Sequence, residues 1–175
     1  MSILKIITIP NRLLKQKSSL VEVVDDKIRS LIEDMLETMY HDNGIGLAAI
    51  QVGVPKRILV VDLSGMDEEE KKNIYPIKMV NPEFIYKSEN MSIADEGCLS
   101  VPGVPVEISR HEAVTIKYLD DLGQEKTIEC DGWLARCFQH EIDHLDGKTI
   151  LDYLSSSIKR DVIIRKLSKA QRTEK

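Results

Sequence analysis

The chain has 175 residues, of which 30% are charged, and carries a formal net charge of −5. This length favours one domain with one core. No apolar run is long enough to cross a membrane, and the first residues lack the charged, apolar and small-residue regions of a signal peptide. We therefore expect a cytoplasmic protein with no membrane partner, whose three cysteines are reduced.

The first predicted element is an amphipathic helix from about residue 25 to 41. Its apolar residues recur at spacings of three and four, the pattern of a helix with one face in a core. Asp25 or Asp26 is expected to cap its start, and Asn43-Gly44 to end it.

A glycine-rich segment, residues 43–53, follows this helix. Its spacing matches neither a phosphate-binding loop nor a dinucleotide fingerprint. Gln51 is a lone amide among apolar neighbours and needs hydrogen-bond partners if it is buried. These partners are either backbone groups, in a structural role, or a developing oxyanion, in a catalytic role. From the residues alone, the structural role is favoured.

Strands are predicted at 57–63 and 77–86. The charged residues between them indicate a solvated surface loop or short helix over 64–75. Farther along, apolar and polar residues alternate over 114–118, and a turn leads into 124–130, which predicts a hairpin.

Asp131 is expected to cap a second helix, which ends at Gly147. This helix carries an HExxH motif, residues 140–144. Residues four apart on a helix differ by ~40° in direction, so His140 and His144 can share one cation, whereas Glu141 is placed to reach a water on it. A carboxylate there can accept a proton and pass it on. The motif predicts a divalent-metal hydrolase, although HExxH also arises by chance on charged helices.

A hydrolytic metal site needs a third protein ligand and one open position. Gluzincin proteases supply a later Glu, but Glu174 is the only one downstream and lies in a basic tail. Metzincins supply a His where Ile150 stands. Neither protease pattern is complete.

The cysteines offer the alternative. Cys98 lies in a stretch shaped by glycine and proline, where Gly97 allows close approach to the backbone. A thiol beside a cation ionises and becomes a ligand. We therefore expect Cys98, His140 and His144 to bind the metal, with water as the fourth ligand.

The other two cysteines, Cys130 and Cys137, are expected to be small buried residues. Trp133 and Cys137 share a helix stripe with the two histidines, so they either floor an apolar pocket or pack in the core. Glu141 falls on the neighbouring apolar stripe, where burial would raise its pKa.

A third helix is predicted at about 157–172, with Ile158, Val162 and Leu167 on its inner side. Residues 155–175 include seven Lys or Arg and two acidic residues. This basic tail is either a solvated helix face or a surface for a polyanion such as RNA.

The order of these elements lacks regular strand–helix alternation. It predicts an α+β fold with mainly antiparallel β-sheets packed around the central HExxH helix, plus an N-terminal and a C-terminal helix. We expect one domain over 1–175, with a catalytic core at about 3–154 and a basic helix at about 155–175.

Three segments together resemble the three motifs of peptide deformylases: residues 44–51 (GIGLAAIQ), 96–100 (EGCLS) and 139–144 (QHEIDH). Their order and spacing also match, and the resemblance runs from about residue 3 to 154. Peptide deformylases remove the N-formyl group from formylmethionine of nascent polypeptides and release formate. The resemblance implies attack of a metal-bound hydroxide on the formyl carbon.

The resemblance also implies roles for the site residues. The metal is expected to be Fe(II), with Zn, Ni or Co able to replace it, and Glu141 is the general acid/base. The oxyanion is expected to be stabilised by Gln51 and the Leu99 N–H, which overturns the structural role favoured above for Gln51.

The substrate contacts implied by the resemblance are of two kinds. The backbone of Ile45, Gly46 and the strand containing Gly97 would pair with an extended peptide, and Trp133 and Cys137 would form the methionine pocket. Trp133 is bulkier than the usual aliphatic residue, and the loop 103–106 lacks a basic residue that some relatives carry. A monomer is expected, and ribosome contact through the basic C-terminal helix is a hypothesis.

Overall fold

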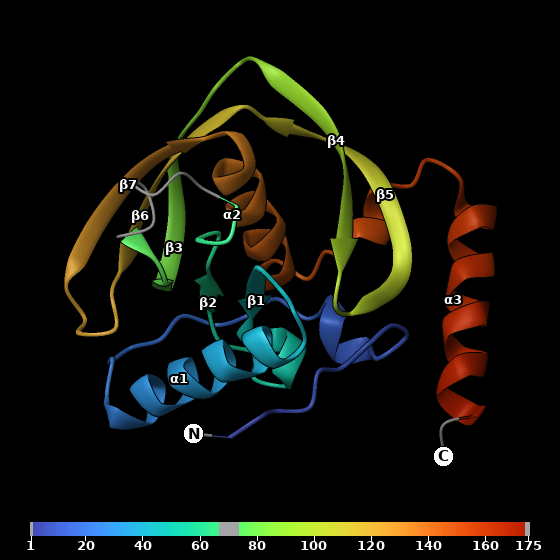
Figure 1. The fold of residues 1–175 in the computed structure, drawn as a ribbon, viewed down its shortest axis with the longest axis horizontal. Coiled ribbons are helices and arrows are strands. Elements are labelled where there is room, and N and C mark those ends of the chain that lie inside the picture. The colour runs from blue at the N-terminus through green and yellow to red at the C-terminus, as the bar shows by residue number, and fades with distance from the viewer. Residues whose placement is uncertain (1, 67–73, 174–175) are drawn as a thin grey trace.

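The computed structural model describes residues 2–66 and 74–173. This part of the chain forms three α-helices, seven strands and three short 3-10 helices (Figure 1). In chain order these are η1 (Arg12–Lys15), α1 (Asp26–His41), β1 (Gly46–Ala48), η2 (Ala49–Val52), β2 (Ile58–Val61), β3 (Ile77–Lys87), β4 (Met91–Cys98), β5 (Val101–His111), β6 (Ala113–Leu119), β7 (Glu125–Asp131), α2 (Gly132–Leu145), η4 (Ile150–Tyr153) and α3 (Ser157–Thr173).

The strands form two antiparallel sheets. One has the order β1-β2-β3-β6-β7, and the other consists of β4 and β5. The HExxH helix α2 lies between them and contacts strands of both (Figure 1). The predicted α+β class, with antiparallel sheets around this helix, is confirmed.

Helix α1 forms as its sequence predicts. The Asp25 carboxylate accepts a hydrogen bond from the Ile28 N–H at 3.0 Å, which satisfies one of the free donors of the first turn. The face that carries Ile32, Met35 and Met39 is fully buried. These side chains pack against β1 and β2, so α1 supports the glycine-rich segment that follows it.

The β6–β7 hairpin and strands β2 and β3 occupy the ranges expected for them, within a few residues. Most of the segment 64–75, interpreted as a loop or short helix, lies outside the described residues. Asp131 is the N-cap residue of α2 as predicted, but its side chain makes no capping hydrogen bond. Asp131 is also the last residue of β7 and pairs with Ala113 there.

The chain turns at Gly147, two residues after the last residue of α2. Gly147 has φ +76°, and a Cβ there would lie 2.5 Å from the Lys15 carbonyl oxygen. Only glycine fits this close approach.

Strands β4 and β5 form a long hairpin, which was not predicted from the sequence. Its register runs from Met91 opposite His111 to Cys98 opposite Val101. The strands arch over α2 (Figure 1), and the end of β4 delivers Cys98 to that helix. Glu96 and Arg110 are buried inside the hairpin and interrupt the apolar alternation of ordinary strands.

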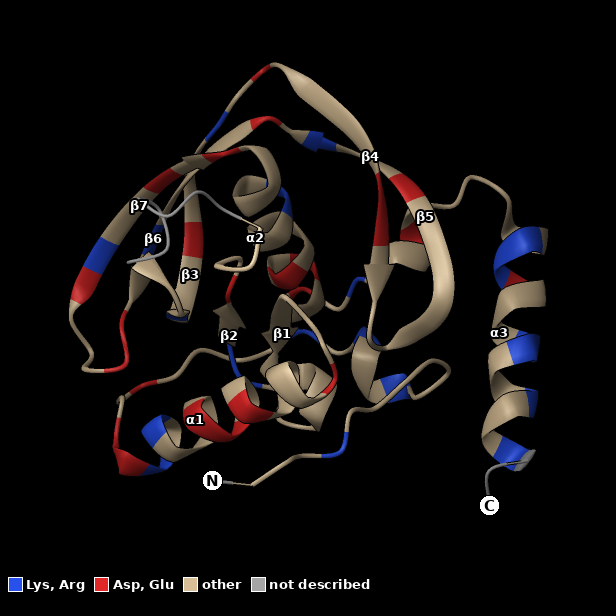
Figure 2. Ribbon diagram, viewed as in Figure 1, with Lys and Arg blue, Asp and Glu red and all other residues tan. Residues whose placement is uncertain are grey.

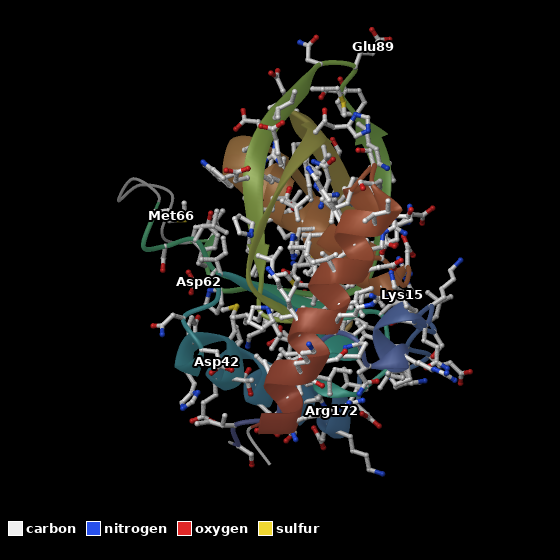
Figure 3. All side chains as sticks on the ribbon, turned by 90° about the vertical axis from the view of Figure 1, so that its right-hand side faces the viewer. Lys15, Asp42, Asp62, Met66, Glu89 and Arg172 are labelled. Atoms are coloured by element: carbon white, nitrogen blue, oxygen red, sulfur yellow. The ribbon has the colours of Figure 1, made fainter. Side chains whose placement is uncertain are left out.

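Helix α3 has a different inner face from the one predicted. Ile158 is 75% exposed and Val162 46% exposed, whereas Ile163, Ile164 and Leu167 pack against a buried apolar cluster formed mainly by β5 and η4. Of the predicted inner residues, only Leu167 is correct. Figure 3 shows α3 in front of the hairpin and running down towards Arg172.

The lower end of α3 is fastened to the N-terminal segment. Gln171 Nε2 donates to the Ile9 carbonyl oxygen at 2.9 Å and also to Thr8 Oγ1. Among the described helices, none is long and apolar enough to cross a membrane.

Candidate metal centre

Cys98, His140 and His144 come together between the hairpin and α2. One ligand atom from each lies within 4.8 Å of the other two. Cys98 Sγ is 3.3 Å from His144 Nε2, and the two imidazole centroids are 5.1 Å apart. His144 is almost completely buried, and Cys98 and His140 are partly buried. Consecutive turns of α2 supply both histidines, and the end of β4 supplies the Cys98 sulfur.

The three donors fit a divalent transition metal. With metal–sulfur and metal–nitrogen bonds of ~2.3 and ~2.0 Å, tetrahedral geometry requires sulfur and nitrogen ~3.5 Å apart. Cys98 Sγ and His144 Nε2 are 3.3 Å apart, and all three ligand atoms lie within 4.8 Å of one another. These separations are close to the requirement. A thiolate with two imidazoles is a typical donor set for such metals, and three protein ligands leave a position for water.

His140 is oriented by a buried carboxylate. Its Nδ1 donates to Glu96 Oε2 at 2.9 Å. Because an ionised carboxylate only accepts hydrogen bonds, Nδ1 carries the proton, and Nε2 is the nitrogen that would bind a metal. Burial opposes ionisation of Glu96, but hydrogen bonds from Arg110 and His140 outweigh it and lower its pKa to about 2. His144 differs, because its Nδ1 has no partner within the described residues.

Glu141 is buried, with 4% of its surface exposed, and its Oε2 has no hydrogen-bond partner in the described part of the chain. Burial raises its pKa to about 7, because the apolar surroundings disfavour the charged form. A carboxyl group with a pKa near neutrality can both accept and donate a proton at physiological pH.

Strand β1 lies directly against this carboxyl group at Gly46. A Cβ on Gly46 would lie 2.5 Å from Glu141 Oε1 and 3.0 Å from Cys137 Sγ. Glycine is therefore required for Glu141 to keep its place.

We expect Gly46→Ala to displace the Glu141 side chain and to lower kcat/KM by about 100-fold, the scale of a 1 Å misplacement. Gly65→Ala is the matched control, because a Cβ there meets nothing within 4 Å. Steady-state kinetics of both variants checks this expectation, and equal activities would contradict it.

Gln51 is buried at the edge of the same site. Its Oε1 accepts from the Ala48 N–H at 2.9 Å, and its Nε2 donates to Ser100 Oγ at 3.1 Å. Nε2 also lies 3.7 Å from Cys98 Sγ. The amide therefore has the structural hydrogen bonds expected of a buried glutamine, and it also stands beside the cysteine.

A pocket of about 580 Å³ opens in front of these groups. Every residue predicted to contact substrate or oxyanion lines it: Ile45, Gly46, Gln51, Gly97, Leu99, Trp133 and Cys137. A Cβ on Gly97 would meet nothing within 4 Å, so the space in front of that backbone is open. Among the ligands, Cys98 and His140 also line the pocket.

The remaining cysteines stay thiols in this environment. Burial raises the pKa of Cys137 well above its usual value and that of Cys130 to about 12. Cys137 Sγ faces the Ile45 carbonyl oxygen at 3.8 Å. Cys137 is buried as expected, whereas Cys130 is only partly buried.

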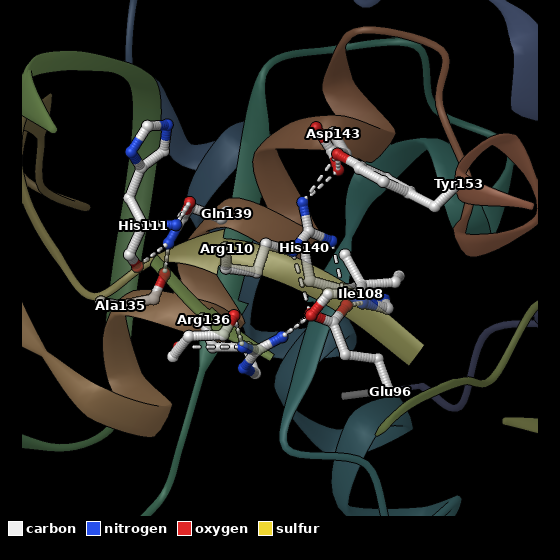
Figure 4. Close-up of polar contacts among 11 residues, drawn as sticks. Glu96, Ile108, Arg110, His111, Ala135, Arg136, Gln139, His140, Asp143 and Tyr153 are labelled. Atoms are coloured by element: carbon white, nitrogen blue, oxygen red, sulfur yellow. Dashed lines mark hydrogen bonds and ion pairs between the residues drawn. The ribbon is translucent and has the colours of Figure 1, made fainter. Parts of the chain in front are cut away.

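Sequence reasoning missed the charged side chains around His140. Arg110, Arg136, Asp143 and Tyr153 form a hydrogen-bonded network with Glu96 (Figure 4). Their partners lie 10 to 44 positions away in the sequence. The one available signal was an arginine on the metal-binding helix, four residues before His140.

The fold and this donor set define a metal-dependent hydrolase of the HExxH class. The sequence model of the polypeptide deformylase family matches residues 3–160. The peptide deformylase of Rickettsia akari is 52% identical over 170 residues, which cover 97% of each chain. That of Rhizobium meliloti is 47% identical over 173 residues, covering 99% of this chain and 97% of the relative.

Solved structures agree with the sequence relatives. The crystal structure of peptide deformylase from Ehrlichia chaffeensis is 45% identical, superposes with a TM-score of 0.90 and covers 99% of both chains. A second crystal structure of that protein, in complex with actinonin, also has a TM-score of 0.90.

The chain belongs to the peptide deformylase family. It is an enzyme, and its reaction is removal of the formyl group from N-formylmethionine.

Proposed function

We propose that this chain deformylates nascent polypeptides through one divalent metal held by Cys98, His140 and His144. The convergence of the three donors, two of which line the pocket, carries the proposal. When bound, the metal supplies Lewis-acid activation of water and of the formyl carbonyl. The resemblance favours Fe(II) in the cell, and the Cys/His/His donor set also accepts Zn, Ni or Co.

Glu141 handles the proton in this scheme. Its carboxylate accepts a proton from the attacking water and then delivers it to the leaving amine of methionine. The unpartnered Oε2 and the pKa of about 7 suit both transfers.

Gln51 Nε2 and the Leu99 N–H are proposed to stabilise the oxyanion that develops on the formyl oxygen. Gln51 supports this role by its position, since Nε2 lies 3.7 Å from the Cys98 sulfur and its Oε1 is fixed by the Ala48 N–H. One such donor is typically worth ~3 kcal/mol of barrier.

The peptide is proposed to bind as an added strand along Ile45, Gly46 and the Gly97 end of β4. In the described structure β4 pairs on one side only, with β5. An unpaired strand edge offers backbone donors and acceptors to an extended peptide. Trp133 and Cys137, on the adjoining turns of α2, would then contact the methionine side chain. Actinonin, with which the Ehrlichia relative forms a complex, is proposed to bind this chain in the same pocket.

Formyl-Met-Ala-Ser and a peptide blocked at both ends separate deformylation from the nearest rival activity, internal peptide cleavage. We expect one formate and one free methionine amino group for each formyl-Met-Ala-Ser consumed, and no cleavage of the blocked peptide. Cleavage of the blocked peptide without formate release would overturn the proposal.

We also propose that α3 contacts ribosomal RNA. Lys and Arg residues recur along this helix (Figure 2), and Lys159, Arg165 and Lys166 are exposed. The opposite face is occupied by the core, so the basic face is the one available to a partner. Clustered cations of this kind bind phosphate backbones in a salt-dependent way.

Reversing the three charges of Lys159, Arg165 and Lys166 to Glu should abolish salt-sensitive co-sedimentation with ribosomes and leave folding unchanged. Reversal of Lys5, Lys17 and Lys27, which are exposed elsewhere, gives the same change in net charge as a control. Equal co-sedimentation of the two triple variants would end the hypothesis.

The remaining organisation is proposed as one domain over residues 1–175, acting as a monomer in the cytoplasm. The deformylase match to residues 3–160 and the packing of α3 against the buried apolar cluster of β5 and η4 support a single unit. Reduced thiols at Cys98, Cys130 and Cys137 suit the cytoplasm.

A further inference from the structure

The Glu96 carboxylate receives four hydrogen bonds and is 5% exposed. Arg110 approaches one edge with two parallel bonds, Nε to Oε1 and Nη2 to Oε2, both at 2.9 Å. Arg136 Nη1 adds a bond to Oε1 at 2.8 Å, and His140 Nδ1 adds one to Oε2 at 2.9 Å (Figure 4). Both oxygens are thus fully used, and the carboxylate cannot turn without breaking a charge-assisted bond.

Arg136 makes more contacts than this one. Its Nη1 also donates to the Ile108 carbonyl oxygen at 2.9 Å, and its Nη2 donates to the Ser92 carbonyl oxygen and Oγ at 2.8 and 3.0 Å. One side chain of α2 therefore joins this helix to β4 and β5. Only 4% of Arg136 is exposed, so these bonds are made in a water-poor environment.

The same guanidinium also reaches the pocket. Its Cζ lies over the Trp133 ring, 5.8 Å from the centroid, and both residues line the pocket. Trp133 is 49% exposed, so its ring needs support on the side away from solvent. A stacked arginine supplies that support.

Charge balance shows why an arginine fits here. Arg110 and Arg136 offset the buried negative charge of Glu96 and Asp143. A lysine at 136 would keep the charge but could not bond to Glu96, Ile108 and Ser92 together, because it lacks the planar fork.

We propose that Arg136 is a positioning residue that holds the metal ligand His140 through Glu96 and supports the Trp133 wall of the substrate pocket. This inference rests on the proposed metal site. The buried side chain of Arg136 then holds both the ligand His140 and the pocket wall that the substrate methionine would contact.

The test uses the full chain loaded with Co(II), and follows transfer of Co(II) to an excess of chelator. Loss of an outer partner of a metal ligand typically weakens binding 10- to 100-fold. We expect Arg136→Met to release Co(II) at least about tenfold faster than the wild-type chain, and Arg136→Lys to fall between them. Where Arg136→Met fails to fold, Arg136→Lys carries the comparison.

Arg57→Met is the matched control. Arg57 is also a largely buried arginine, and its Nη1 donates to Asp146 Oδ1 at 2.8 Å just beyond the other end of α2. It lies outside the pocket lining, so its loss should leave Co(II) release unchanged. Equal release rates in the Arg136 variants and the wild type, or equal acceleration by Arg57→Met, would overturn the proposal.

Tryptophan fluorescence tests the proposed support of Trp133 by Arg136, because Trp133 is the only tryptophan in the chain. Emission should shift to the red in Arg136→Met and stay unchanged in Arg57→Met. Unchanged emission in Arg136→Met would remove the support of Trp133 from the proposal. A wild-type chain that binds no Co(II) would instead remove the proposed metal site itself, and this inference with it.

Discussion

Replacement of Glu141 by alanine is expected to lower kcat/KM for formyl-Met-Ala-Ser by about 1,000-fold while one metal per chain is retained. The carboxylate lies among apolar residues beside the ligands and is itself free of hydrogen-bond partners at Oε2 within the described residues. Removing it eliminates the group proposed to carry the proton, without removing a ligand.

Glu141→Gln separates proton transfer from packing. Glutamine keeps the shape of the side chain but cannot accept the proton, so it should be as inactive as alanine. Glu129→Gln, an exposed substitution on β7, is the control and should behave like wild type. Metal analysis and formate release are measured on the same samples. Substantial turnover in Glu141→Gln would refute the assignment of Glu141.

Loss of the Cys98 thiol is expected to weaken metal binding by more than 100-fold. The loss of an outer partner alone costs about 10- to 100-fold, and Cys98 is proposed as a direct ligand. Its sulfur lies 3.3 Å from His144 Nε2, so its removal breaks up the donor set. Cys98→Ala should therefore be purified almost free of metal and release no formate, and Cys98→Asp should bind metal poorly or with a changed preference.

Cys130→Ala provides the matched control for this substitution. Cys130 is another partly buried cysteine, packed against the apolar core at the end of β7. Its removal should leave metal content and formate release at wild-type values. Full metal content in Cys98→Ala would exclude Cys98 from the ligand set.

Local patterns in the sequence predicted the elements that depend on local interactions. Helix α1 has its apolar face and its capping Asp25 within one stretch of sequence, and the structure has both. Turn chemistry likewise predicted the β6–β7 hairpin. The spacing of His140 and His144 predicted that they face one point, because helix geometry alone determines it.

Non-local interactions account for what was missed. In the β4–β5 hairpin, Glu96 is paired with Arg110, Arg136 and His140, at separations of 14, 40 and 44 positions. Charged residues buried in this way do not show the apolar alternation by which a strand is recognised. The inner face of α3 was misassigned because apolar residues occur on both of its faces, and only its packing on β5 selects Ile163 and Ile164.

Anaerobic titration of the metal-free chain with Fe(II), followed by formate release from formyl-Met-Ala-Ser, tests the central claim most directly. The proposed site predicts no turnover without metal, a linear rise with added Fe(II), and saturation at one Fe(II) per chain. Full turnover of the metal-free chain, or a rate that does not depend on added Fe(II), would contradict the proposal that one metal at Cys98, His140 and His144 drives deformylation.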